Sequence, residues 1–411
     1  MAIREMARLS PAVREILEDD LELSTKDVEQ AVTLPSGCYT SEEWFEFEKR
    51  AIFMREWLCV GRVEQVANVG DFFTLTLVDE PLIVVRSSEQ EIRVMSAVCR
   101  HRAMVITVPG NLTTDSWSQQ PPETTGNCDQ FKCPYHFWAY DLEGKLVGAP
   151  EMHRTPGFDT SEVRLPAFQT EIWNGFIFVN FDAEAAPLAP RLTRLTDTFA
   201  NWHFDDLVDV EPSVEPNLPW NWKVMHENSI ESYHADRLHA GLHGILPSAG
   251  VLPTLYEENE AALIFPIKAT EQDYALNPTF KPLLPTISTL TEEERWIGKF
   301  ALIPPTLLIG LNTDSALYRI VHPTAPGMIN ITFGNLIQKK HLRPKRLKEV
   351  RKMIRYGMVV LGRQDSATNA AVQKGLRSKW APRSRYAWQE DSLPAFNRWL
   401  VTRYKRAAYG E

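Results

Sequence analysis

The chain has 411 residues, of which 44% are hydrophobic and 24% charged, and its formal net charge is −9. This length allows two or three domains with large cores, and the composition is ordinary for a soluble globular protein. The negative charge argues against a nucleic-acid or anionic-membrane partner, because both require a basic face. No apolar run approaches the roughly 20 residues of a membrane helix. We therefore expect neither kind of partner.

The N-terminus and the cysteines indicate the compartment. The N-terminal stretch MAIREMARLSPAVREILEDDLELS is charged throughout, so it does not have the pattern of a secretory signal. Five cysteines are an odd number and too few for a disulfide framework at this length. These features predict a cytoplasmic protein with reduced thiols.

The N-terminal half predicts a helix and then short strands. In TSEEWFEFEKRAIFMREW, Thr40 is a candidate capping residue with Glu43 three positions later. Alternating or β-branched runs at 71–78, 81–86 and 92–98 predict an antiparallel meander. We further expect a hairpin over 139–150, with Gly144 in its turn, and another strand over 173–182.

Beyond about residue 185 helical patterns become more common. The segment 221–239 has helical spacing, and the long amphipathic segment 346–376, which has no proline, predicts one or two helices. The sequence therefore predicts an all-β module followed by a larger α+β portion.

Two short motifs combine a cysteine with a histidine. Cys99-x-His101 follows the last strand of the meander, and Cys133-x-x-His136 lies downstream. Short spacings let each loop present two ligands to one metal centre without costly loop closure. Cys128 lies near the second motif but lacks the Cys-Pro-Tyr-His context. Cys38 and Cys59 have no partner pattern and are expected to be core thiols.

Two kinds of metal centre remain open for this set. Zinc binds Cys₂His₂ sites, but zinc-finger spacings keep like ligands together. Here each loop mixes them, which favours a [2Fe–2S] cluster with thiolates on one iron and imidazoles on the other.

A second constellation lies in ENSIESYHADRLHAGLHG, where His239 follows His234 by five residues and Glu231 precedes His234 by three. Residues five apart do not share a helix face, so these histidines converge only if the helix ends or distorts near the second. Ordinary solvent-facing histidines are the alternative. His226 and His243 are the rival ligands, and Asn228 and Tyr233 are candidates for shaping a pocket.

CRHRA and CPYHFW, with the flanking Pro134, Tyr135 and Trp138, resemble the Rieske motif of the Rieske non-heme iron oxygenases. Two features depart from the family pattern. Phe137 stands where glycine usually follows the second ligand histidine, and a polar insertion over 107–130 lengthens the gap between the ligand loops.

The segment 221–239 is similar to the catalytic motif of the same family, and GRQDSATNAAVQKGL matches the family at Asp365. The resemblance implies that His234, His239 and Asp365 hold one Fe(II), with positions left open for O₂ and substrate. It also implies that Glu231 bridges His234 to the cluster ligand His136 of a neighbouring subunit. Pocket-lining residues are expected from 245–320 and around Asp365.

The resemblance implies a fold and a function. The fold class is α+β: an all-β Rieske domain over 45–185 precedes a helix-grip (START-like) catalytic domain over 186–411, on which an N-terminal helical segment, 1–44, packs. The implied protein is a terminal oxygenase alpha subunit, a homotrimer that receives NAD(P)H electrons through a reductase, with or without a ferredoxin.

With O₂ it would hydroxylate or demethylate a small organic, aromatic substrate. The alternatives are a quaternary-ammonium or alkylamine monooxygenase of the same family, and a Rieske electron carrier without oxygenase activity.

Overall fold

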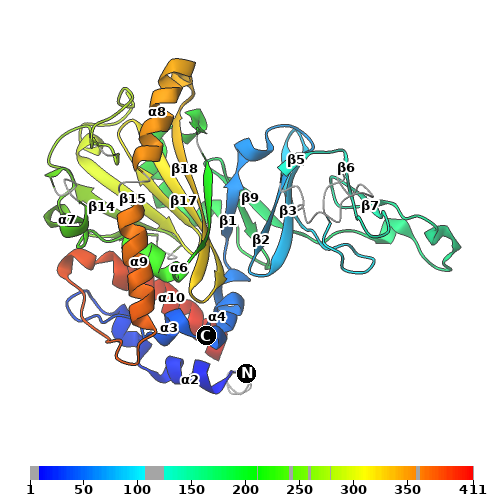
Figure 1. Cartoon of the computed structure of the whole chain (residues 1–411), viewed down its shortest axis with the longest axis horizontal. Coiled ribbons are helices and arrows are strands. Elements are labelled where there is room, and N and C mark those ends of the chain that lie inside the picture. Colours follow the sequence, from blue (N-terminus) through cyan, green and yellow to red (C-terminus); the bar gives the residue numbers. More distant parts are fainter. Residues whose placement is uncertain are drawn as a thin grey trace. The chain divides into compact units, whose positions relative to one another are not determined.

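The computed structural model describes residues 9–106, 125–210, 212–239, 244–257, 261–277, 279–357 and 362–410. They form two compact units (Figure 1). Unit 1 comprises the chain up to Leu58 and from Pro187 onward, and unit 2 is Cys59–Ala186. Unit 2 thus begins at Cys59, whereas the sequence predicted a Rieske domain from residue 45.

Residues 45–58 belong to unit 1 because their apolar side chains pack on its helices. α4 (Glu42–Glu48) continues into a π-helical turn, Lys49–Phe53. Phe47 packs against Tyr404 at 6.0 Å between ring centroids, and Phe53 packs edge-on against Trp222 at 5.3 Å. The side chain of Ser41, and not that of Thr40, caps α4 by accepting the Trp44 N–H.

Unit 2 is built on antiparallel strands. Its larger sheet has the order β1-β10-β9-β4-β3-β2-β5, with β1 Leu58–Arg62, β2 Asp71–Leu77, β3 Glu80–Ser88, β4 Glu91–Ser96, β5 Thr125–Asn127, β9 Ala167–Trp173 and β10 Phe176–Asn180. A small sheet contains β6 (Gln130–Lys132), β7 (Ala139–Asp141) and β8 (Leu146–Gly148). The meander β2-β3-β4 and the hairpin β7-β8 are therefore confirmed.

The predicted strand over 173–182 is divided by a turn. Trp173 ends β9, and Asn174 and Gly175 have positive φ values of 49° and 77° before β10 begins. An Asn-Gly pair tolerates this left-handed backbone and makes a tight hairpin turn. The apolar run was read as one strand because the turn lies inside it.

Unit 1 contains an eight-stranded antiparallel sheet in its described part. The order is β11-β18-β17-β16-β15-β14-β13, and β12 also pairs with β18. The strands are β11 Leu207–Asp209, β12 Ser213–Leu218, β13 Leu255–Tyr256, β14 Leu263–Lys268, β15 Ile297–Ile303, β16 Leu307–Leu311, β17 Ser315–Ala325 and β18 Met328–Gln338.

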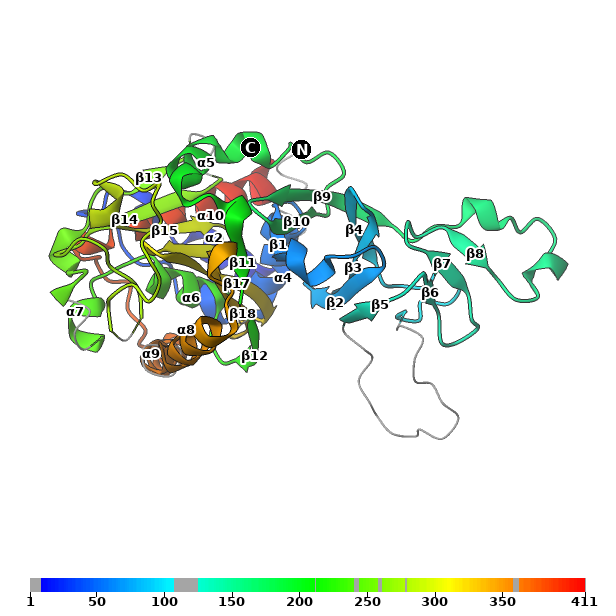
Figure 2. The ribbon, with the colours of Figure 1, turned by 90° about the horizontal axis from the view of Figure 1, so that it is seen from above.

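Helices complete unit 1: α2 Pro11–Glu18, α3 Gly37–Thr40, α4, α5 Thr193–Phe199, α6 Trp222–Ser229, α7 Ala235–Leu238, α8 Pro344–Gly357, α9 Arg363–Leu376 and α10 Ser392–Tyr409. The segment 346–376 thus forms two helices, α8 and α9, which run one after the other in Figures 1 and 2. Unit 1 has both helices and strands, so the predicted α+β class is confirmed.

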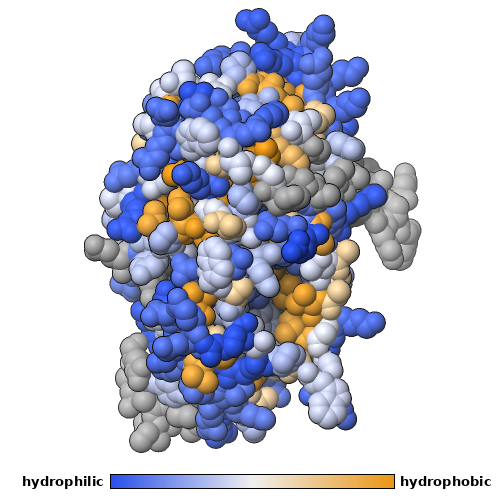
Figure 3. All heavy atoms as spheres, turned by 90° about the vertical axis from the view of Figure 1, so that its left-hand side faces the viewer, coloured by the Kyte–Doolittle hydropathy of each residue, from blue (hydrophilic) through white to orange (hydrophobic). Residues whose placement is uncertain are grey.

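No helix in the described segments is long and apolar enough to cross a bilayer. Hydrophilic side chains cover most of the face that Figure 3 shows, with hydrophobic ones in small groups between them.

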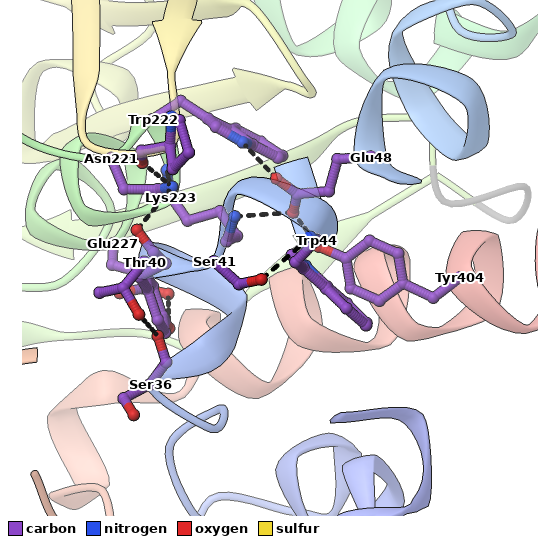
Figure 4. A network of polar contacts seen from close by, with 12 residues as sticks. Ser36, Thr40, Ser41, Trp44, Glu48, Asn221, Trp222, Lys223, Glu227 and Tyr404 are labelled. Carbon is purple, nitrogen blue, oxygen red and sulfur yellow. Dashed lines mark hydrogen bonds and ion pairs between the residues drawn. The ribbon is translucent and has the colours of Figure 1, made fainter. Parts of the chain in front are cut away.

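A buried ion pair fixes α6, the helix that leads to the predicted histidines. Glu48 and Lys223 are both 0% exposed at the side chain and lie 2.7 Å apart. Glu48 also accepts hydrogen bonds from Trp222 Nε1, at 3.2 Å, and from the Tyr404 hydroxyl (Figure 4). The carboxylate therefore joins α4, α6 and α10.

We predict that Glu48→Gln lowers the free energy of unfolding of unit 1 by about 3–5 kcal/mol, because it leaves the Lys223 ammonium buried without its counter-charge. Chemical denaturation followed by circular dichroism measures this loss. The double variant Glu48→Gln/Lys223→Met is the control and should recover most of the stability. A loss below about 1 kcal/mol in the single variant would contradict the role given to the pair.

Candidate functional site

The two Cys/His loops meet at one end of the core of unit 2. Cys99 follows β4 and Cys133 follows β6, and both thiols are buried at 2% exposure within the same hydrophobic cluster. The rings of His101 and His136 lie 4.6 Å apart between centroids. His101 is exposed and His136 is partly buried. The thiols therefore face the core, and the imidazoles lie nearer the surface.

Backbone and aromatic contacts hold these loops. The Cys99 N–H donates to Met104 O at 2.9 Å, and the Cys133 N–H donates to Trp138 O at 2.8 Å. Trp138 stacks on His101, with ring centroids 4.7 Å apart and an interplanar angle of 10°. The Tyr140 hydroxyl accepts the Arg100 N–H at 3.0 Å and lies 3.3 Å from Cys99 Sγ, to which it can donate.

The donor set fits an iron–sulfur cluster. Burial and the neighbouring Cys99 raise the pKa of Cys133, so two thiolates need a cationic centre beside them to coexist here. Thiolates on the inner side and imidazoles on the outer side match a cluster with one cysteine-bound and one histidine-bound iron.

The other three cysteines lie apart from this function. The Cys128 N–H pairs with Gly70 O at the sheet edge, and burial raises the Cys128 pKa to about 11. Cys38 and Cys59 are buried at 1% and 0% exposure, as expected for core thiols.

In unit 1 the helical segment predicted over 221–239 is interrupted before His234, the first predicted ligand. α6 ends at Ser229, and the short α7 begins only after His234. His239 follows the last residue of α7 with φ −101° and ψ 95°, which is extended backbone. Because α7 ends before His239, the two imidazoles converge to 5.2 Å between ring centroids. The requirement that the helix end or distort is met.

Asp365 in the first turn of α9 completes the group. His239 Nε2 lies 3.0 Å and His234 Nε2 lies 3.8 Å from Asp365 Oδ1. The candidate ligand atoms of the three residues all lie within 4.8 Å of one another. Asp365 Oδ1 is buried and has no hydrogen-bond donor among the described residues. A carboxylate oxygen left in this way fits a metal ligand.

Each imidazole is oriented through its other nitrogen. His234 Nδ1 bonds Glu231 Oε1, and Glu231 Oε2 also accepts the His234 N–H at 3.2 Å. His239 Nδ1 lies 2.9 Å from Gln364 Oε1. Because both Nδ1 atoms have acceptors, the tautomer with Nδ1–H is favoured and the Nε2 lone pairs are left for a metal.

The charge state of the carboxylate is suited to this role. Burial alone would raise the pKa of Asp365, but His239, Arg319 and His234 together hold the pKa below its usual value. Asp365 is therefore ionised at neutral pH.

The rival and accessory residues have separate outcomes. His226 Nε2 is 2.7 Å from Pro305 O, and burial lowers the pKa of His226 to about 4, so it is a neutral core histidine. His243 lies outside the described residues. Asn228 lines the cavity beside the triad, whereas Tyr233 is 55% exposed and does not.

A cavity of about 290 Å³ opens beside the three residues. As expected, residues of 245–320 line much of it, including Leu246, Phe265, Phe300 and Leu308. The sequence missed the contributions of β12 and β18. It did not single out Gln364 or Arg319, although both lie in the stretches expected to line the pocket. Gln364 directly precedes Asp365, and Arg319 is a lone charge in the apolar strand SALYRIV, so both had a signal.

Two family models match the chain. The Rieske [2Fe-2S] domain matches residues 56–166, and the ring hydroxylating alpha subunit (catalytic domain) matches residues 199–406. The chain belongs to the ring-hydroxylating alpha-subunit family. The resemblance found in the sequence is thereby confirmed, and so are a [2Fe–2S] domain and a non-heme iron catalytic domain.

Relatives of this alpha subunit include both monooxygenases and dioxygenases. The carnitine monooxygenase oxygenase subunit of Escherichia coli K12 is 28% identical over 52% of this chain and 54% of its own. The benzene 1,2-dioxygenase alpha subunit of Pseudomonas putida is 30% identical over 61% of this chain and 52% of its own. The biphenyl 2,3-dioxygenase alpha subunit of Rhodococcus jostii RHA1 is 34% identical over 53% of this chain and 45% of its own. The chain spans about half the length of these curated relatives.

Solved structures share the fold of this alpha subunit over nearly its whole length. A quaternary ammonium Rieske monooxygenase has a TM-score of 0.74 at 20% identity, covering 96% of this chain and 99% of its own. Naphthalene 1,2-dioxygenase from Rhodococcus sp. has a TM-score of 0.77 at 19% identity, covering 97% and 99%.

Phe137, at the usual glycine position, has a left-handed backbone with φ +60° and is 64% exposed. A left-handed backbone costs a residue with a Cβ about 1–2 kcal/mol. Glycine avoids this cost, but part of the gain is offset because glycine loses more conformational entropy on folding. We predict that Phe137→Gly is about 1 kcal/mol more stable than Phe137→Ala, measured by unfolding of the cluster-loaded protein. Equal or lower stability of the glycine variant would show that the backbone is not strained here.

Proposed function

We propose that this chain is the terminal oxygenase component of a Rieske non-heme iron oxygenase. The observation that carries the proposal is a three-ligand group inside a cavity: two imidazoles with oriented Nε2 atoms and a buried carboxylate oxygen without a donor. A fourth protein ligand would close such a site, whereas three leave positions open for O₂ and substrate.

In this proposal His234, His239 and Asp365 hold one Fe(II). Cys99, Cys133, His101 and His136 hold the [2Fe–2S] cluster. When bound, the two centres supply electrons and activated oxygen for hydroxylation. The residues of the chain keep each ligand in its coordinating tautomer and charge state, and the apolar cavity walls exclude water from the substrate.

Glu231 is proposed as the carboxylate that bridges two subunits. It accepts from His234 through one oxygen and from the His234 backbone through the other, so it is rigidly held beside the iron site. In a head-to-tail homotrimer the same carboxylate would reach the cluster ligand His136 of the neighbouring subunit. One observation that supports such an assembly is that His101 is exposed and His136 is only partly buried in the single chain.

The partners follow from this chemistry. NAD(P)H electrons would arrive through a reductase, with or without a ferredoxin. None of the five cysteines, all of which lie in the described part of the chain, forms a disulfide, which suits the cytoplasm. The reaction on the organic substrate is ring dihydroxylation, monohydroxylation or oxidative demethylation, and relatives named for benzene, biphenyl and carnitine support both aromatic and quaternary-ammonium substrates.

We predict that two variants separate the proposed roles. Asp365→Ala should lose the mononuclear iron and keep the cluster spectrum, because it removes one ligand of three. Glu231→Gln should keep both metals, because a neutral amide can still accept from His234, yet slow product formation at least tenfold.

The measurements are iron content, visible absorbance and product formation from a substrate found by mass-spectrometric screening. Full activity of Glu231→Gln would refute the bridging role. Retention of all iron and activity by Asp365→Ala would refute the oxygenase site itself.

A further inference from the structure

The cavity that contains the proposed iron ligands also contains an arginine without an ion pair. Arg319 lies on β17 and lines the cavity. Its Nη1 donates to Ser229 Oγ at 3.0 Å, and its guanidinium lies 5.7 Å from the ring centroid of Phe333. Among the described residues, no carboxylate oxygen lies within 4.0 Å of a guanidinium nitrogen of Arg319, the distance at which an ion pair would form.

The carboxylates that share the cavity are committed elsewhere or lie farther away. Asp314 accepts from two backbone N–H groups and from Ser315. Glu231 accepts from His234, and Asp365 faces both histidines. Glu215 lines the cavity as well but makes no ion pair with Arg319 among the described residues.

The guanidinium therefore has spare hydrogen-bonding capacity at an enclosed position. It carries five N–H donors, and Ser229 accepts one of them. Burial lowers the pKa of Arg319, which Asp365 and Glu215 offset only in part. A cation held in this way gains from an anion that supplies two acceptor oxygens, since the guanidinium fork matches a carboxylate.

We propose that Arg319 binds a carboxylate of the substrate, so that the substrate of the proposed oxygenase is a small organic acid. The rest of the cavity suits its carbon skeleton, because Phe265, Phe300, Leu308, Leu317 and Ile331 contribute apolar walls. A cavity of about 290 Å³ limits the skeleton to a small one.

Arg319 also has a structural role that must be separated from this one. Ser229 is the last residue of α6, so the guanidinium lies at the C-terminal end of that helix, where positive charge is favourable. Removing that contact lowers the stability of the protein, and this loss weakens the binding of an acid and of its neutral analogue alike. Only a binding role changes the preference for an acid over its neutral analogue.

The test is binding of matched ligand pairs to the iron-loaded protein under anaerobic conditions, by calorimetry. The probes are benzoate, phenylacetate and cyclohexanecarboxylate, each against its primary amide. We expect at least one acid to bind tenfold or more tightly than its amide, and Arg319→Met to reduce that ratio below threefold. Arg319→Lys keeps the charge without the fork and should retain part of the ratio.

Two further variants serve as controls. Arg346→Met removes an exposed arginine of α8 and should leave the ratio unchanged. Glu215→Gln removes the competing negative charge and should bind the acid at least as tightly as the unaltered chain.

The proposal is overturned if no acid binds more tightly than its amide, or if the ratio survives Arg319→Met. Iron content and the cluster spectrum are measured on the same samples. With both centres intact, such a result rejects the organic acid and leaves the oxygenase proposal standing, whereas absence of the metals rejects the oxygenase itself.

Discussion

The end of α7 at Leu238, immediately before His239, is the constraint on which the catalytic unit depends. A continuous helix would point His234 and His239 in different directions, because residues five apart do not share a face. The extended backbone at His239 lets both Nε2 atoms approach Oδ1 of Asp365, which lies on α9. Glu231, in the segment between α6 and α7, and Gln364, which precedes Asp365, orient the two imidazoles through their Nδ1 atoms.

α6, the helix that precedes this group of ligands, is held at both ends. α6 is anchored at its start by the buried Glu48–Lys223 pair, and Arg319 contacts its last residue. The cavity therefore has a fixed wall beside a group of ligands that leaves one side open. In unit 2 the corresponding arrangement comes from two loops whose thiols are buried in a common core and whose imidazoles lie nearer the surface.

The sequence predicted most of the local structure because the signals were local. The meander, the Gly144 hairpin and the pair α8–α9 each have their own periodicity and turn residues. Limits were harder. Residues 45–58 were predicted to begin the Rieske domain, yet Phe47 and Phe53 pack on helices contributed by distant segments. Arg319 was not singled out because its meaning depends on which strand face borders the cavity, which one sequence does not reveal.

The proposed function requires one chain that holds an iron–sulfur cluster and a separate iron with open coordination positions. Metal and acid-labile sulfide analysis of the purified protein tests this most directly. We predict about three iron atoms and two sulfides per chain, with the visible absorbance of a Rieske cluster. Colourless protein that contains zinc and no sulfide would contradict the account.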